Sequence, residues 1–124
     1  MTDVSFTPVI YLKEKCPFCM KIRIFLLESG MAGDVVVRDF APGTNEEQAI
    51  RSELAQHLEK ISFPTAQLAP GQFLSDSDGI IKQLAEGAKV DAAALPVLTA
   101  YLTGPFQQIM TLYRENAELK KQLA

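Results

Sequence analysis

The two cysteines of this chain lie two residues apart, where a strand pattern gives way to a helix pattern. They fall in the stretch YLKEKCPFCMKIR, residues 11 to 23. Before them, Pro8 to Leu12 is short, apolar and β-branched, which is typical of a strand that a proline can open. After them, apolar residues recur at helical spacing, at Phe18, Ile22, Phe25 and Leu26. The chain therefore has to turn from strand to helix at the cysteine pair.

Further strand and helix patterns follow this first unit. The first helix is expected over residues 17–29, largely buried because it is so apolar, and it ends before Gly30. Residues 34–40 (DVVVRDF) predict a second strand, and the consecutive valines indicate a central one. Asn45 is the expected N-cap of a second helix that runs to about Lys60.

The stretch before residue 88 ends with a hairpin pattern and a third helix. The dipeptide Pro70-Gly71 separates PTAQLA from QFLS, which predicts two antiparallel strands. Residues 75–87 (SDSDGIIKQLAEG) predict a short helix that stops at Gly87. The order β-α-β-α-β-β-α predicts an α/β fold with a four-stranded mixed sheet and helices on both faces. We expect one such domain over residues 1–87 and a helical extension over 88–124, packed on the domain or projecting from it.

The composition of the chain excludes some classes of function. Hydrophobic residues make up 48% and charged residues 22% of the 124 residues, which is ordinary for a globular protein. The net charge is −3 and the 12 basic residues are dispersed, so a nucleic-acid surface is not expected. The sequence shows neither a signal-peptide pattern nor an apolar run long enough to cross a bilayer, so we expect a cytoplasmic protein that does not bind membranes. In that reducing compartment, a close cysteine pair favours chemistry or metal binding over a structural disulfide.

The position of the pair predicts an activated thiol. Cys16 falls near the N-cap of the first helix and Pro17 near its first position. Free backbone N–H groups and the positive end of the helix dipole favour the Cys16 thiolate, and Lys13 and Lys15 add positive charge. Such placement lowers a thiol pKa from about 8.5 to roughly 3.5–7.5. Cys19, one turn further, lacks most of this benefit, so Cys16 is the expected nucleophile and Cys19 the resolving thiol.

Other interpretations of the pair remain open. A structural zinc site needs about four ligands, and the chain offers two cysteines and one histidine, His57, on another expected helix, so no metal is expected within one chain. A buried pair without chemistry is one alternative. An iron–sulfur cluster shared between two chains is another. Redox chemistry is the interpretation that we favour.

The ordered set KEKCPFC, SFPTA and SDSDGI resembles the glutaredoxins and the related N-terminal domain of glutathione transferases, over roughly residues 8 to 87. The resemblance implies a thioredoxin fold and glutathione as cosubstrate. It also implies that Lys13 approaches the glycine carboxylate of glutathione. The backbone of Phe63 would pair with the cysteinyl part, and Pro64 would be cis.

The same resemblance assigns the γ-glutamyl end of glutathione to the start of the third helix. The matching residues are Asp76 and Ser77, with Asp78 as a further candidate, and a helix N-terminus suits a carboxylate. Phe18 stands where the family more often has tyrosine, which keeps an aromatic wall and removes a hydroxyl. The Gly-Gly that often precedes this helix is absent, and FLSDSDG is closer to the transferase-like branch.

The sequence has two further notable features, a single histidine and a C-terminal helical segment. His57 lies at the edge of an apolar stripe, and we expect no catalytic role for it. Asp91 is expected to cap a helix that is interrupted near Pro96, and Gly104-Pro105 begins a last helix. On that helix a 3, 4, 3, 4 spacing connects Ile109, Leu112, Asn116, Leu119 and Leu123. This spacing is the a/d seam of a coiled coil and suggests a homodimer, while packing of the stripe on the domain is the alternative.

We therefore expect a glutathione-dependent thiol-disulfide oxidoreductase that reduces protein disulfides or glutathione mixed disulfides. Its partners would be glutathione and disulfide-bonded or glutathionylated proteins. A non-catalytic module that binds glutathione or a protein partner is the alternative. A thioredoxin-type reductase that another protein regenerates is a third.

Overall fold

The computed structural model describes residues 6–123, so residues 1–5 and 124 of the two expected segments lie outside it. Its sheet contains β1 (Val9–Lys13), β2 (Val36–Phe40), β3 (Thr65–Ala69) and β4 (Gln72–Leu74), in the order β2-β1-β3-β4. Strands β1 and β2 are parallel, whereas β1 with β3 and β3 with β4 are antiparallel. The predicted four-stranded mixed sheet of a thioredoxin-like fold is confirmed.

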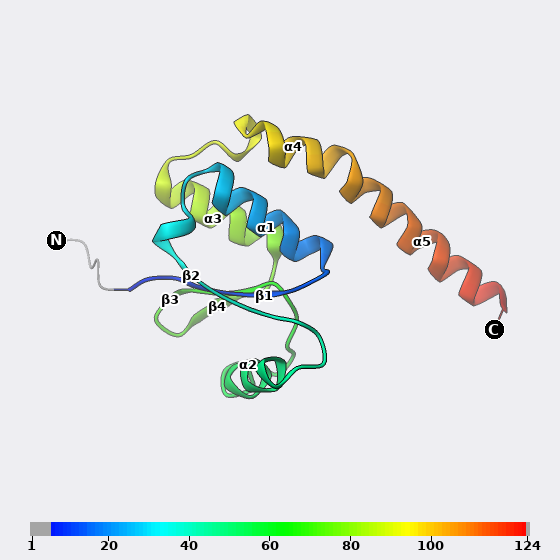
Figure 1. Cartoon of the computed structure of the whole chain (residues 1–124), viewed down its shortest axis with the longest axis horizontal. Helices are drawn as coiled ribbons and strands as arrows, with labels where there is room; N and C mark the ends of the chain where they lie inside the picture. The colour runs from blue at the N-terminus through cyan, green and yellow to red at the C-terminus, as the bar shows by residue number, and fades with distance from the viewer. Residues whose placement is uncertain (1–5, 124) are drawn as a thin grey trace.

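Helices cover both faces of the sheet, as predicted (Figure 1). Helices α1 (Pro17–Glu28) and α3 (Ser77–Ala88) lie on one face, and α2 (Asn45–Ala55) lies on the other. The larger core lies under α1 and α3 and includes Ile10, Leu12, Ile22, Phe25 and Ile80, each fully buried. A smaller core under α2 contains Tyr11, Phe40, Ile50 and Leu54. Alternate residues of β1 thus point to opposite cores, as the pleat requires.

The second strand is an edge strand, which corrects the expectation of a central one. Strand β1 holds the centre because β2 pairs with one of its sides and β3 with the other. Within the described residues no strand pairs with the outer side of β2. Val36 and Val37 are accordingly 47% and 39% exposed. A run of valines indicates strand propensity, but it does not say which edges find a partner.

Helix α1 is also less buried than expected. Its inner face is fully covered, but Leu27 is 74% exposed and Met20 is 43% exposed. The third helix ends at Ala88 rather than at Gly87, and the left-handed residue after it is Lys89, with φ 58°. Its end is therefore set by a non-glycine residue that the sequence pattern did not indicate.

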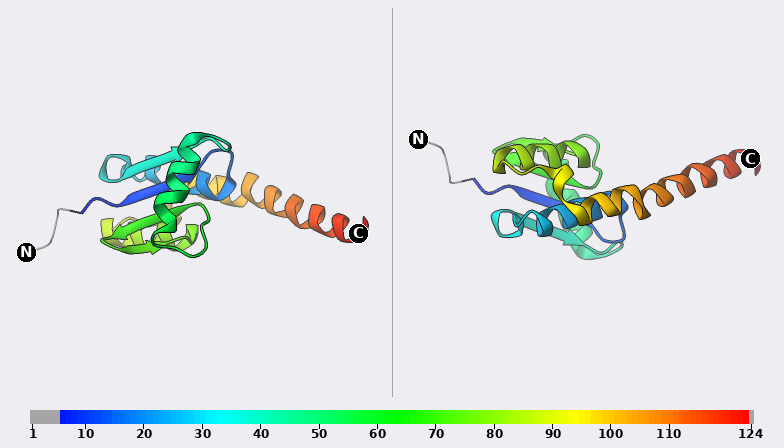
Figure 2. Two further views of the ribbon diagram at one scale, coloured as in Figure 1. Left: turned by 90° about the horizontal axis from the view of Figure 1, so that it is seen from below. Right: turned by 90° about the horizontal axis from the view of Figure 1, so that it is seen from above.

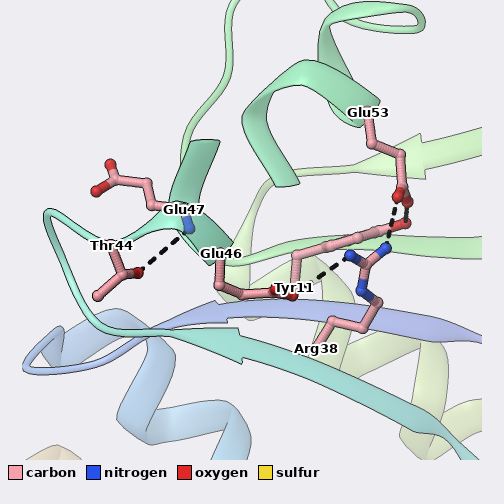
Figure 3. A network of polar contacts seen from close by, with 6 residues as sticks. All are labelled: Tyr11, Arg38, Thr44, Glu46, Glu47 and Glu53. Atoms are coloured by element: carbon pink, nitrogen blue, oxygen red, sulfur yellow. Dashed lines mark hydrogen bonds and ion pairs between the residues drawn. The ribbon is translucent and has the colours of Figure 1, made fainter. Parts of the chain in front are cut away.

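Helix α2 begins one residue earlier than expected, at Asn45 itself. Thr44, not Asn45, is the N-cap, and its hydroxyl accepts a hydrogen bond from the Glu47 N–H (Figure 3). The Glu47 carboxylate in turn accepts from the Gly43 N–H at 2.7 Å. This reciprocal capping satisfies two amides at once. The helix ends at Ala55 rather than near residue 60.

A polar network ties α2 to the sheet. Glu53 accepts hydrogen bonds from the Tyr11 hydroxyl at 2.7 Å and from Arg38 at 2.6 Å, as Figure 3 shows. Burial and this carboxylate raise the pKa of Tyr11 to about 12. The phenol therefore stays a neutral donor, and β1, β2 and α2 are joined at one point.

The C-terminal segment contains a short 3-10 turn (Ala92–Ala94), then α4 (Pro96–Thr103) and α5 (Pro105–Leu123). Asp91 caps the 3-10 turn, and α4 starts anew at Pro96. The carboxylate of Glu28, at the end of α1, accepts from the Val97 and Leu98 N–H groups at 2.7 and 2.8 Å. Helix α4 therefore lies against α1, while α5 runs away from the body of the molecule (Figures 1 and 2). No helix in residues 6–123 is long and apolar enough to span a bilayer.

Candidate active site

Cys16 is the N-cap residue of α1, as predicted. Its backbone is extended, with φ −120° and ψ 120°, and Pro17 occupies the first turn. The Cys19 N–H donates to the Cys16 sulfur at 3.4 Å. Lys15, just before it, has φ 60°, a left-handed conformation that is costly for a residue with a Cβ. This turn brings the sulfur to the mouth of the helix directly after β1.

The environment of Cys16 lowers its thiol pKa from 9.0 to about 6. The largest cause is a hydrogen bond from the Cys19 thiol, and partial burial acts in the opposite direction. The amides of Cys19 and Phe18 lower the pKa further, and the charge of Lys13 contributes least. The predicted direction is confirmed, but the second thiol has a larger effect than the helix amides, and Lys15 is not among the causes.

The pKa of the Cys19 thiol is raised, in contrast to that of Cys16. Its side chain is fully buried, and the Lys13 N–H donates to its sulfur at 3.3 Å. The hydrogen bond that its thiol donates to Cys16 raises the pKa of Cys19 strongly, and burial adds to this. Both thiols are free. The site therefore combines one half-buried thiol that favours the thiolate form with one buried thiol that stays neutral.

The loop before β3 carries the second predicted element. The Phe63–Pro64 peptide is cis, as expected, and Pro64 is fully buried. The Phe63 ring packs edge-on against Phe40 with centroids 4.8 Å apart, and the Arg51 guanidinium lies 5.1 Å from its centre. Phe63 precedes the strand, so its backbone lies outside the β3 ladder.

The start of α3 carries the third element. Asp76 is its exposed N-cap residue, but its side chain makes no capping hydrogen bond. The first-turn amides thus lack the side-chain acceptor that Cys16 and Thr44 provide for α1 and α2. Ser77 is 7% exposed. An acceptor from outside the helix, such as a carboxylate, suits these amides.

Asp78 is engaged with a lysine that sequence reasoning missed. Its carboxylate lies 2.9 Å from the ammonium of Lys21, a residue only 4% exposed. The same ammonium lies 4.4 Å from the centre of the Phe106 ring and 5.5 Å from that of Phe18. The two rings meet edge-on at 5.5 Å. Phe18 therefore packs against α5, and the lysine joins α1, α3 and α5.

Tyr101 of α4 was missed as well. Its hydroxyl donates to the Pro17 carbonyl at 2.8 Å, in the first turn of α1. Burial raises the pKa of Tyr101, and the negative charge of Cys16 adds to the effect, which places the phenol near the thiolate. The contact spans 84 residues of sequence, so no local pattern indicates it. Lys21 had a weak signal, as a charge inside an apolar helix.

His57 lies away from these residues. It is exposed and stacks on Phe73 of β4, with ring centres 4.7 Å apart. Its expected lack of a catalytic role stays a prediction. Across residues 6–123, no three His, Cys, Asp or Glu side chains are grouped so as to hold a metal ion.

Comparison with known proteins identifies the family. Residues 10–93 match the model of the glutathione S-transferase N-terminal domain. A search among curated proteins gives no significant match. The matched range includes β1 from Ile10 onward, both cysteines, the cis-proline loop and all of α3. It covers well over half of the chain, and it agrees with the thioredoxin-like sheet described above. The chain belongs to the family of glutathione S-transferase N-terminal domains.

Proposed function

We propose that this protein is a glutathione-dependent thiol-disulfide oxidoreductase in which Cys16 is the nucleophile. The observation that carries the proposal is the Cys16 sulfur at the α1 N-cap, where the Cys19 thiol and the Cys19 and Phe18 amides lower its pKa to about 6. At pH 7 such a group is roughly nine-tenths thiolate, the form that attacks disulfides. Family membership supports glutathione as the thiol that takes part.

The first step forms one S–S bond and breaks another. The Cys16 thiolate attacks the glutathione sulfur of a mixed disulfide, and the protein thiol leaves as a thiolate that takes a proton from water. The enzyme then carries glutathione on Cys16. A second glutathione thiolate attacks this bond, which releases oxidised glutathione and restores the Cys16 thiolate.

Cys19 serves when the substrate is a protein disulfide. While Cys16 is anionic, Cys19 stays protonated because it donates to that charge. Once Cys16 is in a mixed disulfide, the charge is gone and the pKa of Cys19 falls, helped by the Lys13 N–H. Its thiolate then attacks the Cys16 sulfur and releases the reduced substrate. Because Cys19 is fully buried, its thiolate can attack the neighbouring Cys16 sulfur but cannot reach the disulfide of a large substrate directly.

Glutathione would lie across three elements. Its γ-glutamyl carboxylate would accept from the first-turn amides of α3, at Asp76 and Ser77. Its cysteinyl backbone would pair with Phe63, beside Pro64, and its glycine carboxylate would approach Lys13. One carboxylate oxygen of Asp78 is already paired with Lys21 and fixes that lysine. The other oxygen of Asp78 would accept from the γ-glutamyl ammonium of glutathione.

Activity with a glutathione mixed disulfide tests the proposal. We expect Cys16→Ser to abolish turnover, whereas Cys19→Ser keeps turnover with the mixed disulfide and loses it with a protein disulfide. Full activity of Cys16→Ser would refute the assignment. Replacing glutathione by a thioredoxin reductase as electron donor should give no turnover if the site is specific for glutathione.

A non-catalytic module is the second candidate, and the exposed length of α5 favours it. This alternative predicts that the wild-type chain binds glutathione in calorimetry but turns over no disulfide. Turnover by the wild type and its loss in Cys16→Ser would exclude it. Binding without turnover would replace the first proposal by this one.

A further inference from the structure

Most of α5 has no partner within the described chain. From Thr111 to Leu123 every residue is exposed, and Figure 2 shows the helix leaving the body. Leu112, Leu119 and Leu123 are 61%, 56% and 86% exposed. A lone helix of this length is marginally stable in water, and large exposed apolar side chains on one stripe mark an interaction surface.

The stripe is separate from the side of α5 that docks on the body. Phe106 makes the docking contact and is 9% exposed, next to the Lys21 ammonium. At about 100° per residue, the seam of Ile109, Leu112, Asn116, Leu119 and Leu123 is centred about 100° round the helix from Phe106. A second helix can therefore lie along the seam without displacing Phe106.

We propose that α5 pairs with α5 of a second copy of this chain in a parallel, two-stranded coiled coil. The seam residues occupy positions a and d, with Asn116 at the middle a position. In a parallel pair in register, Asn116 faces Asn116 of the partner subunit, and their side chains hydrogen-bond. A single asparagine at an a position selects register and two strands.

Charge complementarity favours a parallel over an antiparallel pair of α5 helices. Glu115 occupies position g and Lys120 occupies position e, five residues later. In a parallel pair Glu115 meets Lys120 of the partner subunit, and symmetry provides this ion pair twice. An antiparallel pair brings g against g, where the chain has Gln108, Glu115 and Gln122, so Glu115 meets no lysine. It also places Asn116 opposite a leucine.

This inference does not depend on the proposed function. The seam lies beyond the body, so Cys16 stays open in the dimer and the two sites lie at the same end of the coil. Oligomerisation and disulfide turnover can accordingly fail independently of each other.

Sedimentation equilibrium over a wide range of concentrations tests the proposal. The full chain should approach twice the monomer mass, and Leu112→Ser with Leu119→Ser should stay monomeric. Thr111→Ser with Glu118→Gln, on the outer face, is the matched control and should dimerise like the wild type. The proposal would be overturned if the wild-type chain is monomeric at all concentrations, or if the chain with both leucines replaced still dimerises.

Charge exchange and cross-linking test the direction. Glu115→Lys should raise the dimer Kd about 4- to 30-fold, since two attractions become repulsions, and adding Lys120→Glu should restore it. In a chain with Cys16→Ser and Cys19→Ala, Asn116→Cys should form an intermolecular disulfide on oxidation, whereas Glu118→Cys should not. Cross-linking at position 118 alone, or no rescue by the exchange, would refute a parallel pair.

Discussion

Removing the Cys19 thiol while keeping its backbone should raise the pKa of Cys16 and leave Cys16 reactive. The hydrogen bond from that thiol is the largest cause of the low value, ahead of the helix amides and Lys13. Cys19→Ala deletes this donor. Cys19→Ser is the matched variant, because its hydroxyl fits the same space and still donates.

The magnitude follows from the charge on the acceptor. A hydrogen bond to a charged group contributes about 1.5–3 kcal/mol, and one pKa unit corresponds to about 1.4 kcal/mol. Cys19→Ala should thus move the pKa of Cys16 from about 6 to roughly 7–8. Since a thiolate of higher pKa is intrinsically more nucleophilic, its reactivity should rise about 3- to 8-fold at high pH. The variant should be slower than the wild type near pH 6 and faster at alkaline pH.

The rate of alkylation by iodoacetamide as a function of pH reports both quantities. In the alanine variant the only alkylated thiol is Cys16, and the midpoint of the profile is its pKa. The serine variant should keep a midpoint close to that of the wild type. Superimposed wild-type and alanine profiles would show that the backbone amides alone hold the thiolate. A wild-type midpoint near an ordinary thiol would refute the whole electrostatic argument.

The same shift predicts a pH dependence of stability. The folded-state pKa of Cys16 lies below the unfolded value, so the thiolate stabilises the fold at high pH and this stabilisation is lost as the pH falls to about 6. Between pH 6 and 9, the free energy of unfolding should rise less in Cys16→Ser than in the wild type. Urea unfolding at several pH values measures the difference. An equal rise in both proteins would contradict the assignment.

Two contacts of the C-terminal segment give further predictions. Glu28→Ala leaves the Val97 and Leu98 N–H groups without their acceptor and should lower the free energy of unfolding by about 1–3 kcal/mol in urea unfolding, whereas the exposed control Glu59→Ala should change it little. Tyr101→Phe should cost about 0.5–1.5 kcal/mol of stability but leave the alkylation midpoint in place, because the hydroxyl donates to the Pro17 carbonyl and not to the Cys16 sulfur. A shifted midpoint would mean that the phenol contacts the thiolate directly.

The parts of the site that sequence predicted are those made within one turn of chain. An N-cap needs only a suitable residue followed by helix-forming sequence, so the N-cap position of Cys16 and the place of Pro17 in the first turn could be predicted from CPFC. The hairpin around Pro70-Gly71 could also be predicted, because a turn depends on a few consecutive residues. The parallel pairing of β1 with β2 followed from the helix that connects them.

The parts that sequence did not predict depend on packing between distant segments. Apolar periodicity shows which face of an element avoids water but not which element covers it. The prediction that β2 is a central strand was therefore wrong, and the exposure of Leu27 was not predicted. Lys21 meets Asp78 across 57 residues, and Glu28 meets Val97 across 69. No local signal encodes such contacts.

By itself, the sequence determined that a strand must turn into a helix at two cysteines, because strand and helix periodicities change there and Pro17 can only begin the helix. That is enough to specify an activated thiol. Only the tertiary structure decided that Cys19 is fully buried, and that Tyr101 of α4 and Phe106 of α5 lie against Pro17 and Phe18 of α1. The reason is physical: hydrogen-bond strength and burial depend on distances between side chains, and folding alone brings these side chains together.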